Sequence, residues 1–210
     1  MTAVIFDCDG TLVDSEPLAI VAWRRAVAPY GYLLSDAEVE ACIGMPYLRT
    51  HARMTQLAPA LPSAAALWPE LSEQLFALID EALVAFPDAL ATVAELRRRG
   101  VPLAVASSSP RERLDRTLAH VGLEFAVTVA GDEVEHGKPA PDMFLAAAAA
   151  LGVAPQRCVV VEDSAPGIAA GRAAGMPTLA VRRSHPADLG GADRVVDALS
   201  ADAVLALAVR

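Results

Sequence analysis

Short apolar runs recur along the chain, and their length and β-branched content are typical of strands. The first run, at residues 2–6, leads directly into Asp7 and Gly10. Four similar runs follow, at 101–106, 125–130, 157–161 and 177–181. Because they are apolar almost throughout, these runs indicate strands that are buried on both faces of a sheet.

Helical patterns separate the later runs, at residues 88–99, 110–121, 141–151 and 166–174. Each pattern is followed directly by a glycine, the residue that ends many helices. Strands that alternate with such helices predict right-handed βαβ units. The predicted fold class is therefore α/β, with a doubly wound parallel sheet that helices cover on both faces.

Residues 15–84 interrupt this alternation, because their pattern is helical and contains no convincing strand. The candidate helices lie at 17–28, 36–43, 47–57 and 64–83. A helical insert directly after the first strand is best interpreted as a separate lid domain. We therefore predict a core domain of residues 1–14 and 85–210 and a helical domain of residues 15–84, a division that suits a chain of 210 residues. The chain ends with a loop-like stretch at 184–191, followed by a predicted strand and helix.

The composition is that of a compact globular protein, with 54% hydrophobic and 20% charged residues and a mean hydropathy of +0.39. Charge or proline interrupts each apolar stretch well before the roughly 20 residues that a membrane span needs. The net charge of −9 and the pI of about 4.9 disfavour nucleic acid, because an acidic chain gains little from counterion release. We expect neither a membrane nor a nucleic-acid partner.

The cysteines and the N-terminus predict a reducing, cytoplasmic compartment. The first nine residues contain two aspartates and no basic residue, which is unlike a signal peptide. Cys8, Cys42 and Cys158 are odd in number and lack CxxC spacing. Cys8 and Cys158 lie in apolar surroundings, where a small buried thiol is the better interpretation.

Polar residues follow four of the predicted strands. They are Asp7, Asp9, Gly10 and Thr11; Ser107, Ser108 and Ser109; Lys138, the only lysine in the chain; and Glu162, Asp163 and Ser164. Ligands bind beyond the carboxyl ends of the strands in a parallel sheet. We therefore expect carboxylates, hydroxyls and the lysine to converge on one edge of the sheet.

The three aspartates of this set, Asp7, Asp9 and Asp163, predict a magnesium site. They repel one another unless a cation lies between them, and hard oxygen ligands with room for water suit Mg²⁺. With the metal bound, Asp7 stays ionised and can attack phosphorus to form an acyl-phosphate. Asp9 would then be the general acid for the leaving alkoxide and the base for water. The metal, Lys138, the Ser107 hydroxyl and loop amides would stabilise the charge on the phosphoryl oxygens.

Several of these residues have structural alternatives. A lone DxDG sequence is common in turns, and this one lacks the further oxygen ligands of an EF-hand calcium loop. Ser109 begins the sequence Ser-Pro-Arg-Glu, which has the form of a capping box, and we interpret it as a helix cap rather than a catalytic residue. Asp163 and Ser164 could likewise cap the next helix. Lys138 could be a solvated loop charge, and Glu162 is either a direct metal ligand or a partner of one.

The ordered set of motifs resembles that of the haloacid dehalogenase superfamily. Residues 6–12, FDCDGTL, look like its first motif, and Ser107 after an apolar strand matches the second. Lys138 in GKPAPD resembles the third motif, and residues 162–164 in VVVEDSAPG resemble the fourth. The similarity extends over nearly the whole chain. It is greatest to the subfamily of β-phosphoglucomutase and many sugar-phosphate phosphatases, including 6-phosphogluconate phosphatase.

This resemblance implies a Rossmann-like core, an α-helical cap inserted after the first motif, Mg²⁺ and an aspartyl-phosphate intermediate. By position, Asp7 corresponds to the nucleophile and Asp9 to the acid/base. The metal would be held by Asp7, the Asp9 carbonyl and Asp163, with Glu162 as a further candidate. The phosphoryl group would be bound by residues of the second and third motifs: Ser107, Ser108 and Lys138.

Departures from the family's patterns argue against several of the activities found in this family. Dehalogenases lack the second aspartate, which is present here as Asp9, and phosphonoacetaldehyde hydrolases use a cap lysine that is absent here. β-Phosphoglucomutases carry a cap histidine where this chain has Ala19. They also carry an arginine, three residues after a glycine corresponding to Gly44, where this chain has Tyr47. Both differences argue against a mutase.

The predicted function is Mg²⁺-dependent hydrolysis of a small phosphorylated metabolite, with the cap closing over the site. A β-phosphoglucomutase-type mutase is the alternative, and a non-catalytic binding protein is a third hypothesis that the intact motifs disfavour. Substrate contacts are expected from cap residues around Gly44 and Arg49. Arg49 or Arg53 could replace the missing mutase arginine, or either could be a solvated helix residue.

Overall fold

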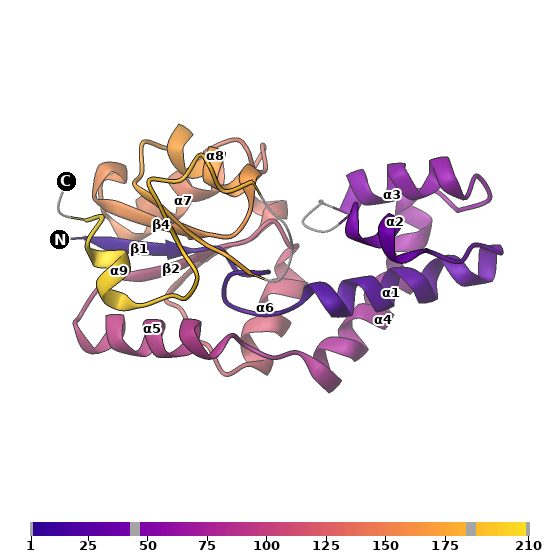
Figure 1. Ribbon diagram of the computed structural model, residues 1–210, viewed down its shortest axis with the longest axis horizontal. Coiled ribbons are helices and arrows are strands. Elements are labelled where there is room, and N and C mark those ends of the chain that lie inside the picture. The colour runs from indigo at the N-terminus through magenta and orange to yellow at the C-terminus, as the bar shows by residue number, and fades with distance from the viewer. Residues whose placement is uncertain (1, 43–46, 184–187, 209–210) are drawn as a thin grey trace. The chain divides into compact units, whose positions relative to one another are not determined.

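A computed structural model describes residues 2–42, 47–183 and 188–208. The chain forms two compact units, one of Met1–Asp14 with Val84–Arg210 and one of Ser15–Leu83. The larger unit contains a sheet, and the smaller is built from helices (Figure 1). Within the described residues, none of the helices combines the length and the apolar character needed to cross a bilayer.

The larger unit is built on a six-stranded sheet in which all neighbouring strands are parallel. The strands are β1 Ala3–Phe6, β2 Leu103–Ala106, β3 Val127–Val129, β4 Cys158–Glu162, β5 Thr178–Val181 and β6 Arg194–Val196. Their order is β3-β2-β1-β4-β5-β6. The chain moves outward from β1 to β3 and then crosses to β4 on the other side of β1. The order therefore reverses between β1 and β4, which is where α/β sheets bind ligands.

Helices cover both faces of this sheet, with α7 and α8 on one side and α5 and α6 on the other (Figure 1). Their bounds are α5 Pro87–Arg98, α6 Arg111–His120, α7 Asp142–Leu151, α8 Ala165–Ala173 and α9 Ala201–Leu205. Two short 3₁₀ turns complete the unit, at Gly131–Glu133 and Pro155–Arg157. Alternate residues of a strand point to opposite faces, so Ala3 and Ile5 pack in one core with Phe144 of α7 and Ala170 of α8.

The predicted α/β fold with a doubly wound parallel sheet is confirmed. Each predicted strand and helix of this unit forms, and its ends differ from the predicted ends by at most two residues. The predicted terminal strand and helix are β6 and α9. β4 extends one residue past its apolar run to include Glu162, whose side chain is fully buried. The apolar pattern could not reveal this, because a buried carboxylate looks like the start of a loop.

The smaller unit consists, in its described part, of helices. They are α1 Glu16–Val27, a 3₁₀ turn at Ala28–Tyr30, α2 Asp36–Glu40, α3 Tyr47–Leu57 and α4 Ala64–Ala82. An aromatic group joins three of them: Tyr47 stacks on Trp23 with ring centroids 5.7 Å apart and meets Trp68 edge-on at 4.7 Å. The Tyr47 hydroxyl also donates to the Ala64 carbonyl at 2.6 Å. Tyr47 therefore contributes to the packing of this unit.

The segments that leave and re-enter the larger unit pair with each other. Val13 and Ala85 form an antiparallel bridge, and the Asp14 N–H donates to the Val84 carbonyl at 2.9 Å. This pairing ties the segment after β1 to the segment that leads into α5.

Arg183, two residues after β5, fixes the same region through its guanidinium. It donates to both carboxylate oxygens of Asp88, at 3.0 and 3.1 Å, and to the Thr11 carbonyl at 2.9 Å. The guanidinium lies 3.8 Å from the centroid of the Phe86 ring. Asp88 also accepts a hydrogen bond from the Leu199 N–H at 2.7 Å. Arg183 thus connects the loop after β1 with the start of α5.

Asp88→Asn is expected to destabilise the larger unit in a pH-dependent way. Burial alone would raise the pKa of Asp88, but hydrogen bonds from Arg183 and Leu199 and the Arg183 charge lower it. Such a carboxyl stabilises the fold above its unfolded pKa of about 3.9, and the contribution is lost as the pH falls through the lower folded pKa. Thermal unfolding near neutral pH should show a loss of about 1–3 kcal/mol in the variant. A difference from wild type that does not shrink below about pH 4 would contradict this assignment.

Candidate active site

Three carboxylates gather where β1 and β4 end. Asp7 directly follows β1, Glu162 is the last residue of β4, and Asp163 comes next. Each offers one oxygen to a group whose members lie within 4.8 Å of one another, and none of the three residues is more than 7% exposed. The pairing of β1 with β4 causes this, because it sets Phe6 beside Val161 and lets the Asp7 N–H donate to the Val161 carbonyl at 2.9 Å.

Lys138 brings a positive charge into this acidic cluster of Asp7, Glu162 and Asp163. Its side chain is 5% exposed. The ammonium donates to the Asp7 carboxylate, to Glu162 Oε1 at 2.8 Å and to the Ala106 carbonyl at 3.1 Å. These acceptors match the three N–H donors of an ammonium group, so Lys138 joins the ends of β1, β2 and β4. The prediction that it is more than a solvated loop charge agrees with this burial.

The Glu162 carboxylate is bonded on both oxygens. Oε1 accepts from Lys138, and Oε2 accepts from the Asp163 N–H at 2.9 Å and from the Ser164 N–H and hydroxyl at 2.8 Å each. Gly167 in the first turn of α8 lies against this carboxylate, and a Cβ at that position would overlap it. Glycine is therefore needed at position 167 to leave room for the buried charge.

Asp163 is positioned by the loop after β1. The Thr11 hydroxyl donates to Asp163 Oδ1 at 2.8 Å. Gly10 has a φ of +83°, and a Cβ there would overlap the Asp163 carboxylate, so only glycine suits this position. The cap of α8 is Ser164, whose hydroxyl accepts from the Gly167 N–H at 3.2 Å. Of the two cap alternatives, the one for Ser164 is confirmed and the one for Asp163 is wrong.

Asp9 is held by a different set of residues. Its Oδ2 accepts from the Ser109 hydroxyl at 2.8 Å and from the Ser107 hydroxyl at 3.3 Å. Its Oδ1 accepts from Arg113 Nη2 at 2.7 Å. These donors come from the segment that runs from the end of β2 into the first turn of α6, so the two aspartates of the first motif make contacts with different parts of the fold.

The interpretation of Ser109 as a helix cap is wrong. α6 begins at Arg111 with Pro110 as its N-cap, and no side chain caps it. Ser109 is buried, its N–H donates to the Ser107 hydroxyl oxygen at 3.1 Å, and its own hydroxyl binds Asp9. The capping-box pattern misled because Pro110 is extended, with a ψ of 156°, and the helix starts one residue later than the pattern requires.

Burial and the neighbouring charges both shift the pKa values of Asp7 and Lys138. Burial raises the pKa of Asp7 well above its ordinary value; Lys138 lowers it, and the charges of Glu162 and Asp163 raise it. Burial would lower the pKa of Lys138, but Asp7 and Glu162 raise it above its ordinary value. The buried cluster thus contains three carboxylates, and the Lys138 ammonium binds two of them, Asp7 and Glu162. The residues fit a divalent cation, which would supply the missing positive charge and for which carboxylate oxygens are suitable ligands.

Three other predicted site residues are Ser108, Arg49 and Gly44. Ser108 is exposed, and its backbone carbonyl packs against Gly131 closely enough to exclude a Cβ there. Arg49 is an exposed residue of α3 in the smaller unit. Gly44 lies outside the described residues.

Arg113 was missed by the sequence analysis. It lies in the first turn of α6, where the positive end of the helix dipole disfavours a cation. An arginine at such a position, four residues after the polar Ser109, indicates a nearby carboxylate partner. That signal was available in the sequence, although the identity of the partner was not.

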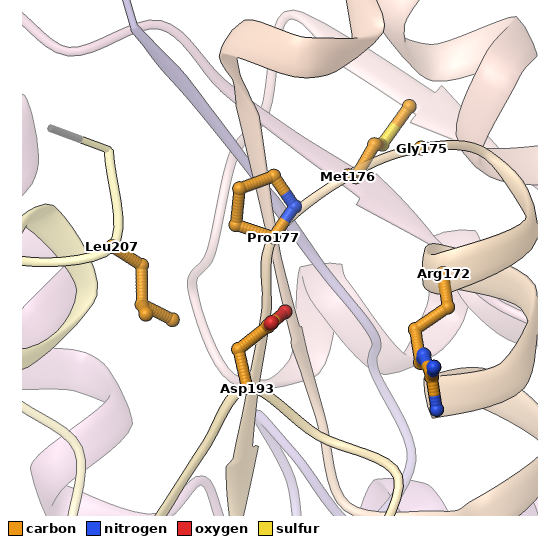
Figure 2. A pocket seen from close by; sticks show the side chains of 6 residues that line it. All are labelled: Arg172, Gly175, Met176, Pro177, Asp193 and Leu207. Atoms are coloured by element: carbon orange, nitrogen blue, oxygen red, sulfur yellow. The ribbon is translucent and has the colours of Figure 1, made fainter. Parts of the chain in front are cut away.

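A pocket on the larger unit lies apart from this site. It is lined by Arg172, Gly175, Met176, Pro177, Asp193 and Leu207, which Figure 2 shows. Pro177 directly precedes β5 and Asp193 directly precedes β6, so the pocket is at the amino ends of these strands. The acidic cluster lies at the carboxyl ends, the opposite edge of the sheet.

Residues 1–175 match the family of haloacid dehalogenase-like hydrolases. The chain therefore belongs to this family and is an enzyme of the hydrolase class. This confirms the resemblance drawn from the four motifs, whose residues meet at the ends of the central strands.

Similarity to individual proteins extends over most of the chain. The chain is 38% identical to the fructose-1-phosphate phosphatase YqaB of Escherichia coli strain K12, over 85% of this chain and 95% of that protein. It is 34% identical to a phosphorylated carbohydrates phosphatase of Thermotoga maritima, over 84% and 82% of the two chains. A solved structure from Thermotoga maritima, of a protein assigned to the β-phosphoglucomutases, is 29% identical with a TM-score of 0.79, over 99% and 98% of the two chains.

Gly167→Ala is expected to destabilise the larger unit although alanine favours helices. The added methyl group overlaps the Glu162 carboxylate, which must then move away from Lys138. Overpacking of this kind costs about 1–3 kcal/mol, more than the gain in helix propensity of about 1 kcal/mol. Thermal unfolding should show a melting temperature lowered by several degrees.

The matched control for Gly167→Ala is Ala169→Gly at an exposed position of the same helix. It weakens the helix by propensity alone, by about 1 kcal/mol, and leaves the Glu162 carboxylate untouched. A Gly167→Ala variant more stable than wild type would show that the carboxylate does not occupy this space.

Proposed function

We propose that this enzyme is a phosphatase that hydrolyses a phosphate monoester of a small sugar or similar metabolite through an aspartyl-phosphate intermediate. The observation that carries the proposal is the buried Asp7 carboxylate bound to Lys138, beside Glu162 and Asp163. A carboxylate held in this way has a fixed orientation and a cation next to it. The relatives named as phosphatases of fructose 1-phosphate and of phosphorylated carbohydrates support a sugar phosphate as the substrate.

We expect Asp7, Asp163 and the backbone carbonyl of Asp9 to hold Mg²⁺. When bound, the ion offsets the negative charge of the phosphoryl oxygens. Glu162 is a weaker candidate for a ligand, because Lys138 occupies one of its oxygens and three donors bind the other. Its proposed role is to orient Lys138 and the first turn of α8.

In the first step, a carboxylate oxygen of Asp7 attacks phosphorus while the bond from phosphorus to the ester oxygen breaks. The leaving alkoxide takes the proton of the Asp9 carboxyl, which becomes ionised. We expect the phosphoryl oxygens to bind residues of the second and third motifs: Ser107, Ser108 and Lys138.

In the second step, water attacks the phosphorus of the aspartyl-phosphate, and ionised Asp9 takes one proton from that water. The bond between phosphorus and the Asp7 oxygen breaks, which releases inorganic phosphate and restores the Asp7 carboxylate. Asp9 is protonated again at the end, so one residue supplies and recovers the proton in each cycle.

The helical unit is proposed to act as a cap that excludes bulk water and selects the substrate. Hinges are expected at residues 14–17 and 85–87, next to the bridge between Val13 and Ala85. Substrate contacts around Gly44 and Arg49 stay predictions, as does the choice of sugar.

A phosphosugar mutase is not favoured. The position of the mutase arginine is Tyr47, whose ring packs with Trp23 and Trp68 and whose hydroxyl binds the Ala64 carbonyl. These contacts give Tyr47 a structural role. A non-catalytic binding protein is disfavoured because the carboxylates and the lysine that the chemistry needs are all present.

The cellular setting is inferred from the composition of the chain. Cys8 and Cys158 are buried free thiols, which suits a reducing compartment and supports the predicted cytoplasmic location. The net charge of −9 favours a small phosphorylated metabolite as the partner over a nucleic acid.

Asp7→Asn is expected to lower the rate of phosphate release by about 10³-fold or more, because an amide cannot take the place of the attacking carboxylate. Phosphate release would be measured with a panel of phosphorylated metabolites, with Mg²⁺ and after its removal by a chelator. The matched control is Asp197→Asn at an exposed position, which should keep wild-type activity. Persistent turnover by Asp7→Asn would rule out the proposed nucleophile.

Asp9→Asn is expected to slow turnover by about 10²–10⁴-fold, because both proton transfers are lost. An aryl phosphate such as p-nitrophenyl phosphate can still load Asp7, since its leaving group needs no proton. The variant should therefore accumulate a phosphoenzyme that mass spectrometry detects after an acid quench and that hydroxylamine cleaves. Wild-type rates of turnover in this variant would exclude Asp9 as the acid/base.

A further inference from the structure

Arg113 binds the carboxylate that is proposed to exchange protons with substrate and water. Its Nη2 lies 2.7 Å from Asp9 Oδ1, and the two side chains are only 18% and 25% exposed. The Ser109 hydroxyl binds the other Asp9 oxygen at 2.8 Å. Donors from the segment between β2 and α6 thus hold both oxygens of Asp9, and they fix the orientation of its carboxyl plane.

The surroundings of Arg113 indicate that this pairing is the main interaction of its guanidinium. Its Nε is buried and has no hydrogen-bond partner among the described residues. It also lies in the first turn of α6, where the helix dipole disfavours a positive charge. The Asp9 carboxylate offsets both costs. Arg111, two residues earlier in the same helix, binds Glu133 and Asp115 instead.

We propose that Arg113 is a positioning residue for proton transfer in this enzyme. It holds the Asp9 carboxyl in place, and Ser109 assists it. The inference rests on the proposed phosphatase function. Arg113 acts through Asp9 and has no proposed contact with the phosphorus, the leaving group or the attacking water.

If Arg113 has this role, its loss should affect two kinds of substrate to different extents. A sugar phosphate releases an alkoxide, which needs the proton of Asp9, whereas p-nitrophenyl phosphate releases a phenolate that is stable without one. The value of kcat/KM reports the steps up to phosphoryl transfer to Asp7. Loss of positioning should therefore lower kcat/KM for the sugar phosphate much more than for the aryl phosphate.

The experiment measures kcat/KM for p-nitrophenyl phosphate and for the sugar phosphate that the wild type hydrolyses fastest. Arg113→Gln removes the cation, and Arg113→Lys keeps a charge with fewer donors. Arg111→Gln is the matched control, because it removes a paired arginine of the same helix that binds Glu133 and Asp115. Asp9→Asn is the reference for complete loss of the acid.

Arg113→Gln is expected to lower kcat/KM for the sugar phosphate by about 10-fold or more and that for p-nitrophenyl phosphate by about 3-fold at most. Arg113→Lys should regain part of the loss. Arg111→Gln should leave the ratio of the two kcat/KM values as in wild type. Equal losses for both substrates in Arg113→Gln would overturn the proposal.

A double-mutant cycle tests whether Arg113 acts through Asp9. If it does, the double variant Asp9→Asn with Arg113→Gln should have a kcat/KM for the sugar phosphate within about 2-fold of Asp9→Asn alone. Losses that multiply would mean that Arg113 acts independently of Asp9, and would overturn the proposal.

Failure of this inference is distinct from failure of the proposed function. A wild-type enzyme that releases phosphate from neither ester would overturn the phosphatase function itself. A selective loss for the sugar phosphate in Asp9→Asn but not in Arg113→Gln would overturn the positioning role alone. Thermal unfolding reports whether each variant folds. If Arg113→Gln does not fold, Arg113→Lys gives the test, because it should still lower kcat/KM more for the sugar phosphate than for p-nitrophenyl phosphate.

Discussion

The Lys138 ammonium, bound to Asp7, Glu162 and the Ala106 carbonyl, is the interaction on which the rest of the site depends. Burying an ion without a partner costs several kcal/mol, so the ends of β1 and β4 could not bring their carboxylates together without a cation between them. The lysine comes from the loop after β3, far along the chain from both acids. Its contacts therefore also hold that loop at the carboxyl ends of β1, β2 and β4.

Space for these charges is created by glycine. Gly10 and Gly167 each face a carboxylate so closely that a Cβ would overlap it, one against Asp163 and the other against Glu162. The glycines of the first and fourth motifs thus have a steric cause that goes beyond turn formation. The N–H groups of Asp163 and Ser164, just before α8, donate to Glu162 and offset part of its charge.

The sheet could be predicted because buried strands are apolar runs in the sequence. The acidic cluster could be predicted because its polar residues come at the ends of these runs. Lys138 could be singled out because no other lysine competes with it. The roles of Ser109 and Arg113 could not be predicted, since their contacts with Asp9 span about a hundred residues of sequence and depend on how α6 packs. Because Pro110 is extended, the Ser-Pro-Arg-Glu sequence does not form the capping box that it resembles. The interpretation of Ser109 as a helix cap was therefore wrong.

Asp7 and Asp9 are separated by a single residue, yet the contacts that hold them come from different parts of the fold. Asp7 and Glu162, the last residue of β4, bind the same Lys138 ammonium. Asp9 is instead bound by Arg113 in the first turn of α6. A change in the first turn of α6 can therefore alter one aspartate without disturbing the buried charges around the other. An enzyme built in this way could be adapted to esters with different leaving groups by substitutions at a few positions, while its nucleophile stays as it is.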